Sequence, residues 1–200
     1  MNLFTQAFNY AAEPFFFKQA ERSDARELYA DVAFLFALLG CAAFVGIGLF
    51  MDVAAYFVAP AYRVGMGIVP ILLLANLFLG LYYNVAVWYK LQDKTFYGAY
   101  IAFFGAALTI VANLALIPFF GYMGAAWATL ICYAGMLGLG FWWGQQHYPI
   151  PYAVGRIGAH IAAAVGLFLL YTYSRHWLVG KGFWWGQQHY PIPYAVGRIG

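Results

Sequence analysis

The sequence has 200 residues, of which 65% are hydrophobic, 22% are aromatic and only 8% are charged. About a quarter of the residues of a typical soluble domain are charged, so this composition excludes such a domain and predicts a membrane protein whose first partner is the lipid bilayer. The net charge of +3 is weak and forms no basic stripe, so we expect no nucleic-acid partner.

An amphipathic segment, residues 3–17, comes first in the chain. Thr5, Asn9 and Glu13 recur every four residues and therefore share one face of a helix. Pro14 would interrupt the backbone hydrogen bonds if the helix continued through it. We interpret this segment as the last part of a transmembrane helix whose beginning is absent.

Charged residues cluster in 18–31, where the spacing of Asp24 and Glu27 resembles a capping box and predicts the start of a helix. At about 1.5 Å per residue, the apolar runs that follow can each cross a hydrocarbon core of about 30 Å. These runs are 32–51, 68–89, 99–117, 122–143 and, more weakly, 157–173. The expected fold class is all-α: a polytopic transmembrane helical bundle of about five full spans plus a partial N-terminal helix, without β-sheet in 32–143.

Short connections separate the spans, and their basic residues predict an orientation. Residues 52–67 form an interfacial connection, 118–121 a tight turn and 145–156 a loop. Alternating sides puts six basic residues on one face of the membrane and three on the other, and the larger group marks the cytoplasm. The six are Lys18, Arg22, Arg26, Lys90, Lys94 and Arg156; the three are Arg63, Arg175 and Lys181.

Residues 140–158 recur unchanged at 182–200. Because a single predicted span separates the two copies, they would face opposite sides of the membrane, and we expect no shared function. Pro191 and Pro193 prevent a regular helix in the second copy. We therefore predict that 182–200 is loosely packed or irregular, crosses no membrane and forms no domain apart from the bundle of 1–181.

A polar stripe marks the second span. Asn76, Tyr83 and Lys90 repeat every seven residues, and Asn84 lies nearby on the same side. For Asn76 two interpretations are equally open: a wall facing an aqueous cavity, or hydrogen bonding between packed helices. For Lys90 a second interpretation is that its long side chain extends to the cytoplasmic interface.

Glu13 is a carboxylate within an apolar segment, and three interpretations stay open for it. It is a proton or cation site, a counter-charge for a basic partner on an absent helix, or a group solvated near the interface. We expect the candidate residues of a substrate cavity to face the side where another lobe would dock. They are Asn9, Glu13, Asn76, Tyr83, Asn84 and Lys90.

Sequence signatures of enzymes are absent. There is no phosphate-binding loop, no metal-ligand spacing and no nucleophile–base–acid set, so we predict no catalytic residue, metal or cofactor and expect that the chain is not an enzyme. Cys41 and Cys132 fall inside apolar runs and are expected to be buried free thiols. Thr109 with Asn113 is interpreted as packing, and Gly140 with Gly144 as a helix contact.

Four segments resemble the oligosaccharide flippases of the multidrug/oligosaccharidyl-lipid/polysaccharide exporter superfamily: 7–18, 21–27, 69–90 and 121–129, the last reading GYMGAAWAT. The similarity covers roughly 1–175 and corresponds to the C-terminal lobe only. The resemblance implies a two-lobed helical bundle that moves lipid-linked oligosaccharide across the bacterial inner membrane, by alternating access, for cell-surface polysaccharide such as lipopolysaccharide. The implied partners are that lipid and a missing N-terminal lobe or second membrane subunit. The alternative is a non-transporting scaffold or assembly subunit of an envelope-biosynthesis complex.

Overall fold

A computed structural model describes residues 1–57 and 59–178, and all of its regular structure is helical. No strand occurs in these residues, so the all-α fold class is confirmed. The elements are α1 (Asn2–Gln19), α2 (Ala25–Leu49), α3 (Met51–Phe57), η1 (Pro60–Ile68), α4 (Val69–Val85), α5 (Val87–Leu91), α6 (Phe96–Phe120), α7 (Tyr122–His147) and α8 (Val154–Leu178).

Five of the helical segments are long and apolar enough to cross a membrane, as the sequence predicts. Their bounds are Ala25–Leu49, Gly65–Leu91, Phe96–Phe120, Tyr122–His147 and Val154–Ser174. The shorter N-terminal helix is α1, with 18 residues. The chain is therefore a multi-pass membrane protein.

Several helix bounds differ from the prediction. Two helices continue through a proline that was expected to interrupt their backbone hydrogen bonds or to lie in a turn. α1 runs through Pro14, and α6 runs through Pro118 to Phe120. The turn after α6 is made at Gly121, whose φ of +54° is a conformation that favours glycine. The predicted loop 145–156 shortens to 148–153, since α7 continues to His147 and α8 begins at Val154.

The start of α2 was predicted at the right place for a wrong reason. Asp24 is the N-cap residue, but its side chain makes no cap hydrogen bond. Its carboxylate instead accepts two hydrogen bonds of 2.7 Å from the Arg22 guanidinium, which lower the pKa of Asp24. Glu27 in the first helical turn still favours the start electrostatically, because a helix N-terminus attracts negative charge.

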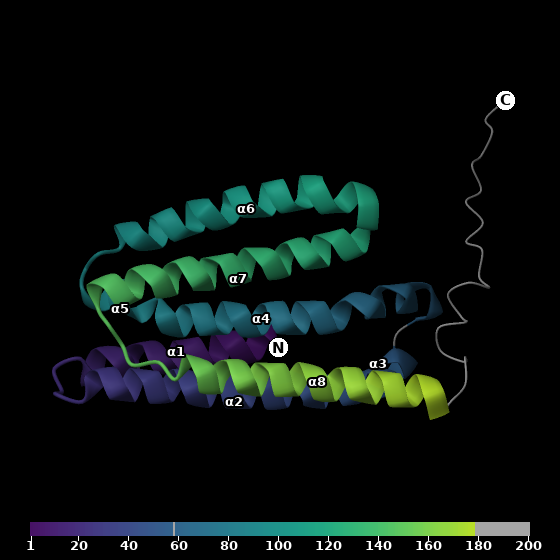
Figure 1. The fold of residues 1–200 in the computed structure, drawn as a ribbon, viewed down its shortest axis with the longest axis horizontal. Helices are drawn as coiled ribbons and strands as arrows, with labels where there is room; N and C mark the ends of the chain where they lie inside the picture. Colours follow the sequence, from purple (N-terminus) through teal and green to yellow (C-terminus); the bar gives the residue numbers. More distant parts are fainter. Residues whose placement is uncertain (58, 179–200) are drawn as a thin grey trace.

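α4 lies in the middle of the bundle, as Figure 1 shows. It packs against α7 on one side and against α1 and α2 on the other. α6 then covers α7, and α8 packs on α2. The central position of α4 makes its polar side chains the ones most constrained by neighbouring helices.

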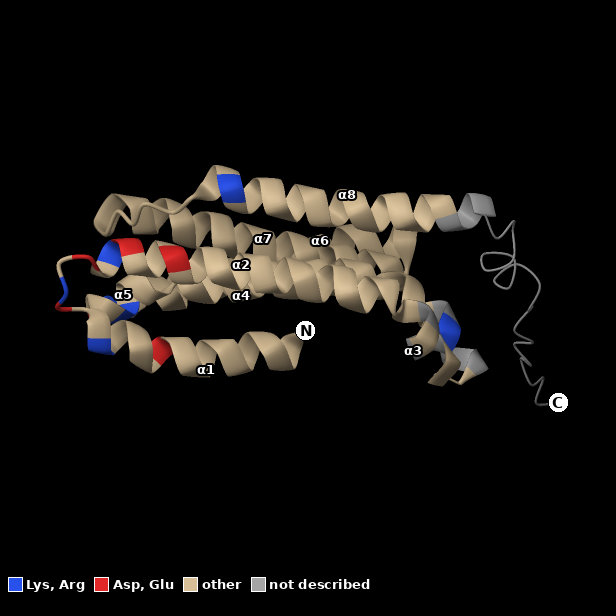
Figure 2. Cartoon of the chain, turned by 90° about the horizontal axis from the view of Figure 1, so that it is seen from below, with Lys and Arg blue, Asp and Glu red and all other residues tan. Residues whose placement is uncertain are grey.

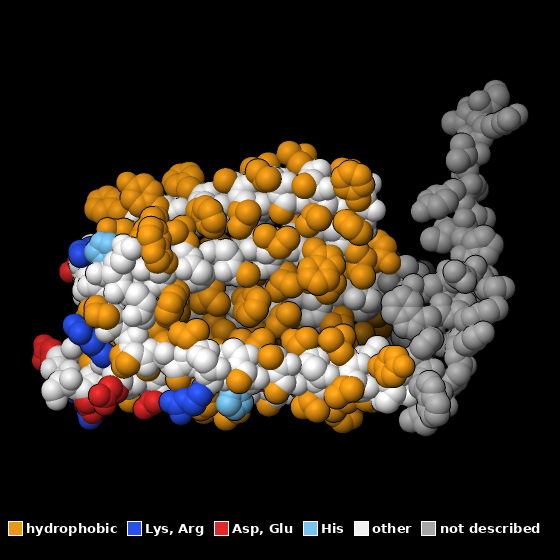
Figure 3. Space-filling model, in the orientation of Figure 1, with side chains coloured by type: hydrophobic (Ala, Val, Ile, Leu, Met, Phe, Trp, Pro, Cys, Tyr) orange, Lys and Arg blue, Asp and Glu red, His pale blue; other side chains and the backbone are white. Residues whose placement is uncertain are grey.

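Most of the charged residues lie at one end of the bundle (Figure 2). At this charged end α1 ends, and α2, α6 and α8 begin; α5 also lies there. The charged end therefore carries the six basic residues that were predicted to share one side of the membrane. Arg63 lies in η1, at the other end beside α3. On the face seen in Figure 3, hydrophobic side chains cover the helices along their length, which suits contact with lipid.

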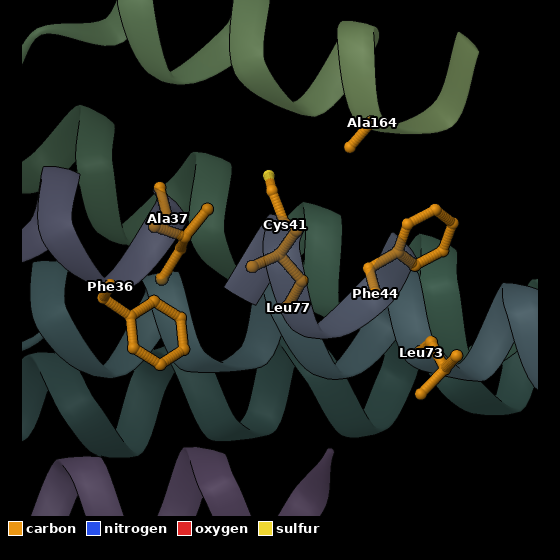
Figure 4. Packing of buried hydrophobic residues seen from close by; sticks show 8 residues of the cluster. Phe36, Ala37, Cys41, Phe44, Leu73, Leu77 and Ala164 are labelled. Atoms are coloured by element: carbon orange, nitrogen blue, oxygen red, sulfur yellow. The ribbon is translucent and has the colours of Figure 1, made fainter. Parts of the chain in front are cut away.

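The largest apolar cluster joins α2, α4 and α8 (Figure 4). Phe36, Cys41 and Phe44 of α2 lie between Leu77 of α4 and Ala164 of α8, and all five are buried. Both cysteines, Cys41 here and Cys132 in α7, are free and buried, as predicted.

The first copy of the repeat spans the end of α7, the loop 148–153 and the start of α8. Gly140 and Gly144 are buried there, and a Cβ added to them would meet Tyr82 and Trp88 respectively. The predicted helix contact at this glycine pair is therefore confirmed. The second copy, 182–200, lies outside the described residues, and the prediction for it stays a prediction.

Candidate functional site at the α1–α4 interface

The two polar stripes identified in the sequence face each other. Glu13 Oε2 lies 2.8 Å from Lys90 Nζ, and Thr5 Oγ1 donates a 3.5 Å hydrogen bond to the Asn76 carbonyl. Residue numbers rise together on both sides, so the two helices run in the same direction. We call this interface the α1–α4 seam; its polar residues are Thr5, Asn9, Glu13, Asn76, Asn84 and Lys90.

Gly80 brings the helices together in the middle of the seam. A Cβ at this position would clash with the Phe36 ring of α2 and lie 3.0 Å from Thr5 Cγ2. Without that carbon, Thr5 packs against α4 with only 1% of its surface exposed. Asn9 is four residues beyond Thr5 and Asn84 four beyond Gly80, so these two amides reach the same level of the seam.

The Glu13–Lys90 ion pair bears on two of the three interpretations left open for Glu13, and the proton or cation site stays a prediction. Glu13 has a counter-charge, but its partner is Lys90 of this chain, not a residue on an absent helix. The two side chains are 37% and 31% exposed, so both also reach the surroundings at the charged end. Lys90 therefore fixes α1 to α5 as well as extending toward the interface.

Replacing Lys90 with alanine should destabilise the protein by about 1 kcal/mol, between the values for exposed and for buried ion pairs. The cost arises because the Glu13 side chain would lose its ion-pair partner in a half-buried place. We would measure the free energy of reversible unfolding in mixed micelles. Lys94→Ala is the control, since Lys94 is exposed and forms no ion pair with a described residue. An equal loss for both variants would contradict a specific pair.

The asparagines of α4 bond to their own helix. Asn76 Nδ2 donates to the Leu72 carbonyl at 2.8 Å, and Asn84 Nδ2 donates to the Gly80 carbonyl at 2.9 Å. Neither amide donates to a neighbouring helix, so the interpretation of Asn76 as a side-chain link between packed helices is not supported. The cavity interpretation stays a prediction.

Unused hydrogen-bonding capacity remains at the level of Asn9 and Asn84. Asn84 is 5% exposed, and its Oδ1 has no hydrogen-bond partner among the described residues. Asn9 is half-buried, and its side-chain amide makes no hydrogen bond with a described residue. Because a buried polar atom without a partner is costly, this level of the seam favours the entry of another polar group.

Tyr83 lies beside the seam. Its ring is 5.7 Å from that of Tyr82 and packs on the aromatic cluster that joins α4, α5 and α6. It is two helical turns from Asn76 in nearly the same direction, and both side chains are half-buried. The structure therefore brings five of the six predicted residues to the seam and leaves Tyr83 next to it.

An aromatic–histidine cluster at the charged end was not predicted. The His147 ring stacks on Trp88 with 5.4 Å between centroids, and its Nε2 is 2.8 Å from the Tyr97 hydroxyl. His147 Nδ1 lies 3.0 Å from the Trp143 carbonyl, which can only accept, so Nδ1 donates this hydrogen bond. The cluster fixes α5, α6 and α7 to one another. Three separate helices supply it, and no local sequence pattern indicates that.

The loop 148–153 closes the charged end over this cluster. Gln145 Nε2 donates to the Ile150 carbonyl at 2.8 Å, and the Arg26 guanidinium lies over the Tyr148 ring, 4.5 Å from its centroid. Burial raises the pKa of the Tyr152 phenol, whose hydroxyl has no partner among the described residues. The loop is therefore packed against the bundle through both aromatic and polar contacts.

Within the described residues, no group of three or more His, Cys, Asp or Glu side chains is placed to hold a metal ion. The chemistry available at the seam is hydrogen bonding by amides and a hydroxyl, beside one neutralised ion pair. Comparison of the chain with protein-family models, with curated proteins and with solved structures found no match.

Proposed function

We propose that this chain forms one lobe of a transporter that moves lipid-linked oligosaccharide across the bacterial inner membrane for cell-surface polysaccharide biosynthesis. The observation that carries the proposal is the α1–α4 seam, where Asn9 and Asn84 keep unused hydrogen-bonding capacity inside the membrane region. The segments that resemble the flippases, 7–18 and 69–90, contain α1 from Ala7 to Lys18, all of α4, and α5 up to Lys90.

The chemistry of the seam suits the uncharged sugar part of such a lipid. Amide and hydroxyl groups donate and accept hydrogen bonds as sugar hydroxyls require, and half-buried Tyr83 adds an aromatic surface beside Asn76. Glu13 and Lys90 neutralise each other, so they add no net charge to this wall. In this proposal the charged end faces the cytoplasm, as the excess of basic residues predicts.

The second candidate is a non-transporting scaffold or assembly subunit of an envelope-biosynthesis complex. One observation favours it: polar side chains in the spans bond to the carbonyl four residues earlier in their own helix. Examples are Asn76, Asn84, Thr109, Asn113 and Thr129. The side-chain donors of such helices are satisfied without a substrate. The two candidates differ in whether the seam is required for sugar movement.

Replacing Asn76 with leucine should lower transport of lipid-linked oligosaccharide about tenfold, the cost of about 1.4 kcal/mol expected for losing hydrogen bonds to a bound sugar. Asn113→Leu in α6 is the matched control, because Asn113 is also half-buried and also donates to its own helix, at 2.9 Å. We would measure sugar transfer in proteoliposomes that contain the chain with its partner lobe, normalised to protein amount. Equal transport by both variants would favour the scaffold.

A further inference from the structure

The polar contacts that hold α1 weaken with distance from the charged end. Near that end, Glu13 pairs with Lys90 at 2.8 Å, and the Tyr29 hydroxyl donates to the Phe16 carbonyl at 2.9 Å. Toward the start of α1, the contact from Thr5 to the Asn76 carbonyl stretches to 3.5 Å. The shorter directional bonds therefore lie in the second half of α1.

The first half of α1 is held mainly by aromatic contacts. Phe4 stacks on Phe36 of α2 with 5.6 Å between ring centroids, and Phe8 meets the same ring edge-on at 4.9 Å. Apolar contacts are not directional, so separating these rings breaks no hydrogen bond and no ion pair. Leu3 and Tyr10, 83% and 76% exposed, add little packing to this half.

Pro14 places a weak point between the two halves. Proline has no N–H, so the carbonyl of Tyr10, four residues earlier, lacks the usual helical hydrogen bond. Helices bend at such positions. The weak point adjoins Glu13, the residue that fixes α1 to Lys90.

We infer that residues 2–9 of α1 form an arm that swings about the Tyr10 carbonyl, which Pro14 leaves without its helical hydrogen bond, while the second half of the helix stays fixed. In this structure the arm is closed, and both Thr5 and Asn84 are buried. Outward movement uncovers the side of α4 that carries Asn76 and Asn84, and a sugar then satisfies Asn84 Oδ1, which has no partner among the described residues. This inference deepens the proposed function and rests on it for the identity of the ligand, but the movement is measurable without any substrate.

Thiol labelling tests the arm directly. Thr5→Cys and Ala12→Cys place probes at two buried positions of α1, 1% and 8% exposed, one in the arm and one in the fixed half. With N-ethylmaleimide in membrane vesicles, Thr5→Cys should label about tenfold faster than Ala12→Cys, because only the arm opens locally. The native Cys41 and Cys132 are internal controls, because their protection in each variant reports an intact bundle.

A second substitution in the Thr5→Cys variant distinguishes movement of the arm at the proline break from a loosening of the whole bundle. Pro14→Ala restores the hydrogen bond to the Tyr10 carbonyl and should slow labelling of Thr5→Cys about fivefold, as expected when a helix break is repaired. Equal labelling rates at positions 5 and 12, or no effect of Pro14→Ala, would overturn the inference. If Thr5→Cys exposes Cys41, hydrogen exchange of the unmodified chain replaces it: amides of 2–9 should exchange faster than those of 15–19, and Pro14→Ala should slow them.

The outcome for the arm and the outcome for transport can be distinguished. Fast labelling at position 5 together with no oligosaccharide transport would support the arm and contradict the proposed function. Transport by a chain in which Thr5→Cys is fully protected from labelling would support the proposed function and contradict the arm.

Discussion

Gly80→Val should destabilise the protein by about 2–3 kcal/mol, the upper part of the range for overpacking a close-packed interior. A Cβ alone at this position already clashes with the Phe36 ring, which is fully buried and touches Phe4 and Phe8 of α1. The ring therefore has no free space to move into. We would measure the free energy of reversible unfolding in mixed micelles.

Gly138→Val is the matched control for this substitution. Gly138 lies in α7, and a Cβ added there meets nothing within 4 Å. The same change in helix propensity without the clash should cost less than about 1 kcal/mol. Similar losses at the two positions would mean that Gly80 is not the contact point of α1, α2 and α4.

Trp143→Ala should destabilise the protein by about 2–3 kcal/mol, somewhat less than a fully buried tryptophan because its ring is half-buried. The Trp143 ring meets Tyr97 edge-on with 5.2 Å between centroids, and the cluster around Trp88 depends on this contact. Removing it would loosen the attachment of α6 to α7 at the charged end. Unfolding in mixed micelles is again the measurement.

The duplicated segment supplies an unusually close control, Trp185→Ala. Trp185 has the same neighbours in sequence as Trp143, because 182–200 repeats 140–158. One helix, α8, separates the copies, so the chain enters and leaves it at opposite ends of the bundle. We expect no measurable loss for Trp185→Ala. A loss as large as that of Trp143→Ala would show that the second copy builds an equivalent packed structure.

The fold was predictable because it depends on the length and polarity of whole segments. Runs of about 20 apolar residues have one stable form in lipid, a helix that satisfies its own backbone hydrogen bonds. Helix ends depend on single contacts, which the sequence pattern does not contain. Asp24 shows this, since Arg22 binds the carboxylate that the pattern assigned to a helix cap.

The candidate site was predictable as two stripes but not as one interface. Spacing alone identified Thr5, Asn9 and Glu13 on one helix and Asn76 and Lys90 on another. That the stripes face each other follows from the packing of α1 on α4, a contact between residues more than 70 positions apart in sequence. We expected both stripes to face another lobe; the Glu13–Lys90 pair satisfies part of that polarity within the chain.

Photo-crosslinking tests the proposed role of the polar side of α4 most directly. A benzophenone amino acid at Tyr83, beside the seam, and another at Phe103, 76% exposed on α6, would be irradiated in inner membranes that contain lipid-linked oligosaccharide. Adducts would then be identified by mass spectrometry. A sugar-bearing adduct at position 83, with only phospholipid at position 103, is the result that we expect for a transporter wall. Adducts with phospholipid alone at both positions would contradict the transporter wall and favour the non-transporting scaffold.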